Sequence, residues 1–223
     1  MRKSGVLMHI TSLPGSYGVG TLGKEAFAFI DFLKKAGQQT WQLLPLNPTG
    51  YGDSPYQSCS AFAGNHYLID LDTLVEEGLL KREEIEAVNW GDKETLVDFG
   101  CLYRERCKVL QLACDRFVPG EDYAAFVAEN EKWLADYAIF MALKEENNGK
   151  TWLNWEESLK NHDAAALAEK REALKETVEL HYFEGLSVKE IAEELGIPVG
   201  TVKWRLSEGR KLLRKEYGVM NEE

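Results

Sequence analysis

The segment that decides the fold covers residues 5–46, which read GVLMHITSLPGSYGVGTLGKEAFAFIDFLKKAGQQTWQLLPL. It opens and closes with short apolar runs, residues 5–10 and 40–46, that are typical of buried strands. Between them, residues 24–36 place Phe27, Ile30 and Leu33 on one helical face and end before a glycine that can cap a helix. A strand, a helix and a second strand form a βαβ unit, so the sequence predicts two parallel strands joined by a right-handed crossover.

A glycine pattern lies between the first predicted strand and the helix. Residues 18–23 match GxGxxG, the fingerprint of many dinucleotide-binding proteins. That fingerprint needs its first glycine at the end of the strand, so that the pyrophosphate reaches the helix N-terminus. Here residues 11–17 intervene, and no acidic residue ends the second strand. We therefore interpret these glycines as residues required by the geometry of the loop, not as a nucleotide-binding site.

A long loop, residues 47–65, follows the second predicted strand and is rich in Gly, Ser, Tyr and Pro. Loops of this length inside compact domains are usually functional. Its centre, residues 50–58, reads GYGDSPYQS. An aromatic ring can cover the apolar face of a pyranose while polar side chains bond its hydroxyls, so the composition suits carbohydrate. The same composition also describes many ordinary turns, and both interpretations stay open at this point.

The remaining composition excludes several classes of protein. No stretch approaches the roughly 18 apolar residues of a membrane helix, and the N-terminal apolar run is too short for a signal peptide. The four cysteines form no CxxC pair, so we expect no metal site and no redox motif. We expect a cytoplasmic protein without a cofactor. Beyond the loop the sequence predicts helices at residues 71–80, 94–117 and 123–147, then a charged helix or linker at 163–175.

Three motifs in the first 170 residues resemble the 4-α-glucanotransferases, the amylomaltases or disproportionating enzymes of glycoside hydrolase family 77. They are residues 9–15 (HITSLPG), 38–46 (QQTWQLLPL) and above all 50–58. Segments 74–80 and 133–144 are similar to that family as well. Cys59 and His66 depart from the usual pattern of that family, which more often has proline at the position of His66.

The resemblance implies the N-terminal portion of a TIM (β/α)₈ barrel, incomplete and rich in helices. It implies an α-1,4-glucan or maltooligosaccharide as partner, bound by loop residues Tyr51, Asp53, Ser54 and Tyr56. It also implies retaining transglycosylation, which needs a carboxylate nucleophile and a carboxylic acid about 5 Å apart. In this family both lie on later barrel strands, so we assign no catalytic residue and expect no turnover by the isolated chain. With two or three of eight strands, edges and apolar faces would be left uncovered.

The charge distribution changes near the C-terminus. The whole chain has a net charge of −11, which argues against general affinity for nucleic acid. Residues 198–217 nevertheless carry six basic and two acidic side chains. Upstream of them, Ser187 and Glu190 form a capping-box pattern, and residues 196–198 (GIP) predict a turn between two amphipathic helices.

Residues 171–217 resemble region 4 of bacterial sigma factors, a helix-turn-helix that reads the −35 promoter element. The resemblance implies promoter DNA, and with it RNA polymerase, as partners. In a helix-turn-helix the second helix enters the major groove by its N-terminal end. The predicted DNA-contacting side chains lie on that helix or just after it: Thr201, Lys203, Trp204, Arg205, Arg210 and Lys211. A solvated amphipathic hairpin is the alternative explanation.

The sequence thus predicts an α/β segment at residues 1–170 followed by an all-α helix-turn-helix domain at 171–223. Three functions compete. The chain is a DNA-binding protein with a non-catalytic remnant of a glucan site, or a glucanotransferase fragment that needs the missing barrel half. The third alternative is a fusion of two unrelated genes without an integrated role.

Overall fold

The computed structural model describes residues 3–93, 95–182, 184–197, 199–203, 205–206 and 209. It divides into two compact units, Met1–Val118 (unit 1) and Pro119–Glu223 (unit 2). Among the described residues no helix is both long enough and apolar enough to cross a membrane.

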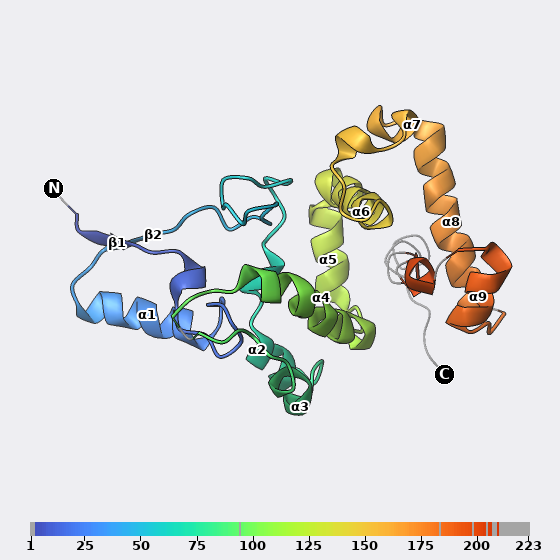
Figure 1. Cartoon of the computed structure of the whole chain (residues 1–223). Coiled ribbons are helices and arrows are strands. Elements are labelled where there is room, and N and C mark those ends of the chain that lie inside the picture. Colours follow the sequence, from blue (N-terminus) through green and yellow to red (C-terminus); the bar gives the residue numbers. More distant parts are fainter. Residues whose placement is uncertain are drawn as a thin grey trace. The chain divides into compact units, whose positions relative to one another are not determined.

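Unit 1 begins with the predicted βαβ unit. Strands β1 (Gly5–Leu7) and β2 (Thr40–Gln42) pair in parallel, with Val6 opposite Trp41 (Figure 1). Helix α1 (Lys24–Lys35) lies between them in the chain. The prediction of two parallel strands around a helix is confirmed, although each strand has three residues and is shorter than the apolar run that predicted it. In both strands the end residues are exposed and the middle residue is half-buried, so the expected burial of the strands is wrong.

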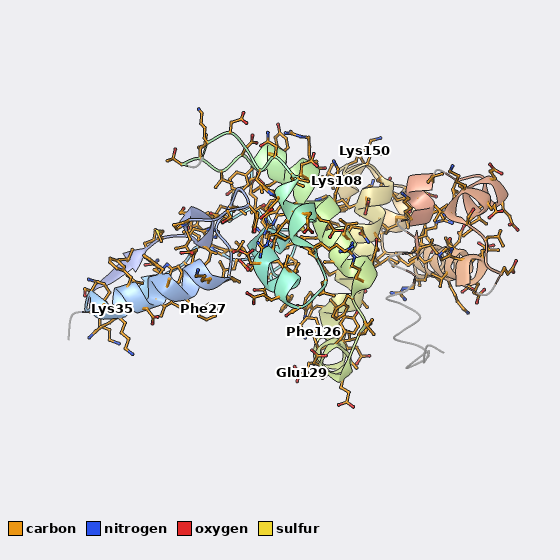
Figure 2. All side chains as sticks on the ribbon, turned by 90° about the horizontal axis from the view of Figure 1, so that it is seen from below. Phe27, Lys35, Lys108, Phe126, Glu129 and Lys150 are labelled. Atoms are coloured by element: carbon orange, nitrogen blue, oxygen red, sulfur yellow. The ribbon has the colours of Figure 1, made fainter. Side chains whose placement is uncertain are left out.

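The buried face of α1 differs from the predicted one. Ala26 and Leu33 are buried, whereas Phe27 is 68% exposed and Ile30 is 48% exposed. Figure 2 shows the Phe27 side chain on the outer side of the α1 ribbon. An α/β sheet normally presents enough strands for a helix to cover with its whole apolar stripe. The two short strands here cover only part of that stripe, so the prediction for Phe27 and Ile30 is wrong.

The rest of unit 1 is built from short helices. These are the 3₁₀ helices η1 (Ile10–Ser12) and η2 (His66–Leu68), then α2 (Leu71–Glu76), α3 (Arg82–Glu86) and α4 (Phe99–Arg116). The predicted helix 71–80 ends early because Gly78 turns the chain with a φ of +76°. The helix predicted from residue 94 begins at Phe99, where the Asp98 carboxylate accepts a hydrogen bond from Cys101 N at 2.9 Å.

A fully buried arginine, Arg106 of α4, connects distant parts of unit 1. Its guanidinium donates to the carbonyl oxygens of Ile69, at 2.5 Å, and Tyr17, at 3.4 Å. It also lies 5.9 Å from the ring centroid of Trp90, within reach of a cation–π interaction. Burial lowers the pKa of Arg106 to about 10. Among the described residues Arg106 Nε has no hydrogen-bond partner.

The GxGxxG segment packs tightly against its neighbours. A Cβ atom on Gly20 would lie 2.1 Å from the Ile10 carbonyl oxygen, and one on Gly23 would lie 2.1 Å from an Asp70 carboxylate oxygen. At Gly18 the clash would be with the Trp90 carbonyl oxygen, at 2.5 Å. Close approach of the loop to other segments therefore accounts for glycine at these three positions.

The described part of unit 2 forms helices and turns. Helices α5 (Glu121–Glu129) and α6 (Glu131–Glu146) replace the single helix predicted at 123–147. They meet at Asn130, whose ψ of +14° is not helical and which hydrogen-bonds the Phe126 carbonyl at 2.8 Å. The 3₁₀ helix η3 (Trp152–Asn154) and α7 (Glu157–Lys160) follow.

Helix α8 (Ala164–Tyr182) runs without interruption through the boundary predicted near residue 170. It is followed by α9 (Val188–Leu195) and by helical residues 199–203. Ser187 and Glu190 form the predicted capping box, and Gly196 ends α9 with a φ of +63°. Apolar side chains of all three segments share one cluster of buried residues: Val178, Leu180, Ile191, Ala192, Val202 and Leu206.

Candidate functional site

The loops that follow β1 and β2 leave the same edge of the sheet because the two strands are parallel. In (β/α)₈ barrels this edge carries the active site. His9, two residues after the end of β1, connects the two loops: its Nδ1 lies 2.8 Å from Thr11 Oγ1 and its Nε2 lies 3.3 Å from the Pro45 carbonyl oxygen. His9 falls within the apolar run 5–10 and opens the motif 9–15, and neither pattern predicted that its ring would link the two loops.

The centre of the long loop closes into a hairpin. Thr49 and Ser58 form an isolated antiparallel bridge, and Gly50 N donates to the Gln57 carbonyl at 3.0 Å. Inside the hairpin, Asp53 N donates to the Gly50 carbonyl at 3.1 Å. The loop is therefore held by its own backbone hydrogen bonds, as in compact functional loops.

The structure brings the four predicted glucan-contacting residues together on this hairpin. Asp53 lies at the turn with a φ of +54°, and its carboxylate accepts a 3.4 Å hydrogen bond from Thr49 Oγ1. Ser54 is half-buried, and its Oγ accepts from Tyr56 N at 3.4 Å. The rings of Tyr51 and Tyr56 project into solvent and are 103% and 73% exposed.

The base of the loop is fixed more firmly than its tip. Asn47 Nδ2 donates to the Ala63 carbonyl at 3.1 Å, and Asn65 N donates to the Leu46 carbonyl at 2.8 Å. The Asn65 side chain also caps η2 by accepting from Tyr67 N at 2.9 Å. Burial raises the pKa of Tyr67 to about 12, and the nearby Asp53 carboxylate adds to the effect.

These contacts present two aromatic rings and several hydroxyl and carboxylate oxygens on one preformed loop. Apolar sugar faces stack on such rings, and sugar hydroxyls bond such oxygens. The arrangement is suited to binding an extended sugar chain at the carboxyl edge of the strands.

A second, open hollow of about 620 Å³ lies elsewhere in unit 1. Tyr17, Asp72 and Arg82 form part of its wall, and their side chains bond one another: Tyr17 donates to Asp72 at 2.8 Å, and Arg82 donates to both. Burial and the Asp72 carboxylate raise the pKa of Tyr17 to about 12. None of the predicted site residues lines this hollow.

The residues predicted to contact DNA are described only in part. Trp204, Arg210 and Lys211 lie outside the described residues. Lys203 is exposed and Thr201 is half-buried. Arg205 is half-buried and lines a small cavity, about 10 Å³, that also touches Glu146 of α6 and Lys170 of α8. Arg205 therefore faces neighbouring helices in unit 2, an orientation that the sequence did not predict.

Comparison with known proteins identifies the relatives of this chain. The family model for 4-alpha-glucanotransferase, Glyco_hydro_77, matches residues 8–197. The chain is 47% identical to the 4-alpha-glucanotransferase of Clostridium butyricum over 173 residues, which is 77% of this chain and 36% of that protein. It is 46% identical to the Thermus thermophilus enzyme over 211 residues, covering 89% of this chain and 41% of that enzyme.

A solved structure leads to the same relatives. The amylomaltase of Streptococcus agalactiae in complex with acarbose superposes with a TM-score of 0.71 at 35% identity, covering 96% of this chain and 39% of that one. The chain thus spans well under half the length of these relatives.

The family match also includes α8 and α9, since it continues 27 residues beyond position 170. The family model thus matches further along the chain than the resemblance seen in the sequence, and both the division at residue 170 and the assignment of the following residues to a sigma-factor module stay predictions. Taken with the loop hairpin and the parallel strands that carry it, these matches show that the chain belongs to the 4-alpha-glucanotransferase family, glycoside hydrolase family 77.

Proposed function

We propose that this chain supplies the N-terminal glucan-binding part of a 4-α-glucanotransferase and transfers α-1,4-glucan segments only together with the rest of the barrel. The hairpin at residues 49–58 carries this proposal, because it presents Tyr51 and Tyr56 to solvent at the carboxyl edge of β1 and β2. The relatives that match in sequence are named 4-alpha-glucanotransferases, and the similar solved structure is an amylomaltase in complex with acarbose.

The need for a complementing part is supported by the uncovered surface of the βαβ unit. Phe27 and Phe32 of α1 are 68% and 61% exposed, and Leu7 of β1 is 59% exposed. Exposed apolar surface next to short parallel strands is typical of a sheet that continues with further strands. The two carboxylates of retaining transglycosylation would come from those later strands.

The test of this proposal is complementation. The chain is mixed or co-expressed with the portion of the Clostridium butyricum enzyme that lies beyond the matched region, and glucose release from maltotriose is measured. We expect no glucose from either part alone and measurable turnover from the pair. A pair that forms a stable complex but releases no glucose would refute the proposal.

Binding by the hairpin is tested separately by isothermal titration with maltooligosaccharides. Tyr56→Ala should weaken binding about tenfold, the effect of losing roughly 1.4 kcal/mol of contact between the ring and the apolar face of a sugar. Phe126→Ala on α5 is the matched control, since it removes a half-exposed ring from the other unit (Figure 2). Equal binding by the two variants would exclude the hairpin as the glucan site.

A second candidate function, promoter binding by residues 171–223, is favoured by one observation. Apolar side chains of α8 and α9 share a core with Val202 and Leu206, and α9 ends in a left-handed glycine before the next helical segment. Such a bihelical arrangement is the shape that a helix-turn-helix needs. RNA polymerase would then be the larger partner.

Lys203→Ala tests this second function. If Lys203 contacts a phosphate, the variant should weaken duplex binding and reduce the slope of log affinity against log salt by about one. Lys189→Ala is the matched control, because Lys189 is an exposed lysine on the preceding helix α9. Binding that does not weaken as salt rises would contradict a phosphate contact.

A further inference from the structure

One pair of side chains in unit 1 combines a nucleophile with a base. Cys107, on an exposed position of α4, has its Sγ 3.7 Å from Nε2 of His66, which opens η2. The two residues are 41 positions apart in the chain, so the fold creates the pair. All four cysteines lie in the part of the chain that the structure describes, and all are thiols.

The surroundings of His66 keep its ring in the neutral form, which has a lone pair free to accept a hydrogen bond. Burial of the ring, together with the positive charge of Arg106, lowers the pKa of His66 below its usual value. The imidazole is therefore neutral near pH 7 and can take the proton of a thiol within hydrogen-bond distance. A thiol next to a base or a cation is the usual setting of a reactive cysteine.

Other charged and titratable groups face the same place. Arg106 interacts electrostatically with Cys107, and the Tyr67 phenol does so from η2. Tyr103, one turn before Cys107 on α4, and Asp53, from the hairpin, also face Tyr67. The arginine favours a thiolate and the carboxylate opposes one. Arg106 interacts with Cys107 itself, and because the arginine is fully buried its field is poorly screened, whereas Asp53 faces the Tyr67 phenol.

The other cysteines have different environments. The buried Cys101 thiol donates to the Asn89 carbonyl at 2.8 Å, which holds its proton on sulfur. Cys59 is exposed on the long loop. Since Cys59 and Cys107 are both exposed, access alone cannot make one of them faster than the other by a large factor. Cys59 therefore provides an internal reference for the effect of the histidine.

We propose that Cys107 is a modification site of this chain, at which His66 promotes thiol–disulfide exchange with low-molecular-weight disulfides. Cys107 Sγ attacks one sulfur of the disulfide, an S–S bond to the protein forms, and the disulfide's own S–S bond breaks. The thiol proton passes to His66 Nε2, and from there it neutralises the departing thiolate. One disulfide and one thiol are consumed, and one mixed disulfide and one thiol are produced.

The site lies at the foot of the long loop. His66 directly follows Asn65, whose backbone N–H donates to the Leu46 carbonyl and closes that loop. A mixed disulfide on Cys107 would therefore add a bulky group beside the segment that anchors the hairpin. The proposal does not depend on glucan binding, and its test uses no glucan.

The experiment treats the full chain with oxidised glutathione and follows each cysteine by peptide mass spectrometry. Cys107 should be modified about tenfold faster than Cys59 at neutral pH, the scale expected when a neighbouring base supplies the thiolate. His66→Asn should lower the Cys107 rate to that of Cys59 and leave the Cys59 rate unchanged. Equal rates of the two cysteines in the unaltered chain would overturn the proposal.

Two further measurements keep the test independent of the folding of the variant. In denaturant the rates of Cys107 and Cys59 should converge, because the pair exists only in the folded chain. A Cys107 rate that stays high in denaturant would assign the reactivity to local sequence and refute the role of His66. In the folded chain, the modification rate of Cys107 plotted against pH should show a step at the pKa of the His66 ring, which is measured by NMR. A profile without that step would contradict the role of His66 as the base.

Discussion

The two units of this molecule are stabilised in different ways. Unit 1 has short strands and short helices that are tied together by side chains bonding distant backbone, with Arg106 as the main example. The described part of unit 2 consists of helices and turns whose buried side chains are apolar apart from Thr177, and Thr177 bonds the carbonyl of Ala173 in its own helix. Unit 1 should therefore be sensitive to single polar contacts, and unit 2 to the filling of its core.

The sharpest test of this difference is Arg106→Met. The variant keeps much of the side-chain volume but leaves the carbonyls of Ile69 and Tyr17 without their donor. We expect unit 1 to lose about 4 kcal/mol, because buried polar partners are left unsatisfied. Hydrogen exchange read by mass spectrometry separates the units. Unchanged protection in unit 1 would mean that Arg106 does not hold it together.

A smaller effect is expected from Gly20→Ala. The added Cβ would meet the Ile10 carbonyl oxygen and the Leu13 backbone. Overpacking of this kind costs about 1–3 kcal/mol. Gly64→Ala is the matched control, since nothing lies within 4 Å of its added Cβ. Chemical denaturation of both variants should show a loss for the first alone; equal midpoints would contradict the tight packing of the loop.

In unit 2 the loss of a single polar contact should matter less than in unit 1, and Ser187→Ala tests this. It removes the side chain that accepts from Glu190 N and half of the capping box of α9. We expect the free energy of unfolding of unit 2 to fall by about 1 kcal/mol, and hydrogen exchange should become faster in unit 2 only. Glu190→Gln should cost less, because an amide can still accept from Ser187 N. If unit 1 loses protection as well, the two units do not respond separately.

The smallest effect at neutral pH concerns Tyr67→Phe, whose consequence appears in alkaline solution. Burial raises the pKa of Tyr67 to about 12, above the ordinary value of 10.0. A group with a raised pKa stabilises the fold fully below the unfolded pKa and loses that contribution as pH rises through the folded pKa. The stability of the natural chain relative to Tyr67→Phe should thus fall between pH values of about 9 and 12. Urea unfolding of both proteins across that window measures the difference, and a constant difference would disprove the shift.

The features that follow from local patterns could be predicted from the sequence. The capping box at Ser187 and the left-handed Gly196 depend on neighbouring residues, and both are observed. The same is true of α1, predicted at residues 24–36 and found at Lys24–Lys35. The loop that carries Tyr51 and Tyr56 was found through its motif, whereas its closure into a hairpin was not predicted.

The features that depend on distant contacts could not be predicted. An arginine within a helical pattern is normally predicted to lie on the surface. Arg106 is buried because the carbonyl oxygens of residues 17 and 69, which are distant in the chain, accept hydrogen bonds from its guanidinium. The exposure of Phe27 depends on how many strands pack against α1, and the periodicity of apolar residues in a helix does not give the number of strands. The Cys107–His66 pair likewise joins positions 41 residues apart.

The continuity of α8 has a practical consequence for anyone who wishes to produce the parts separately. A cut at residue 170 would divide a 19-residue helix. The buried residues Leu174 and Val178 would then lack the helical turns that precede them. The non-helical stretch around Val118 and Pro119 is the safer place to divide the gene. Expression of residues 119–223, rather than 171–223, is the design that keeps the DNA-binding question answerable.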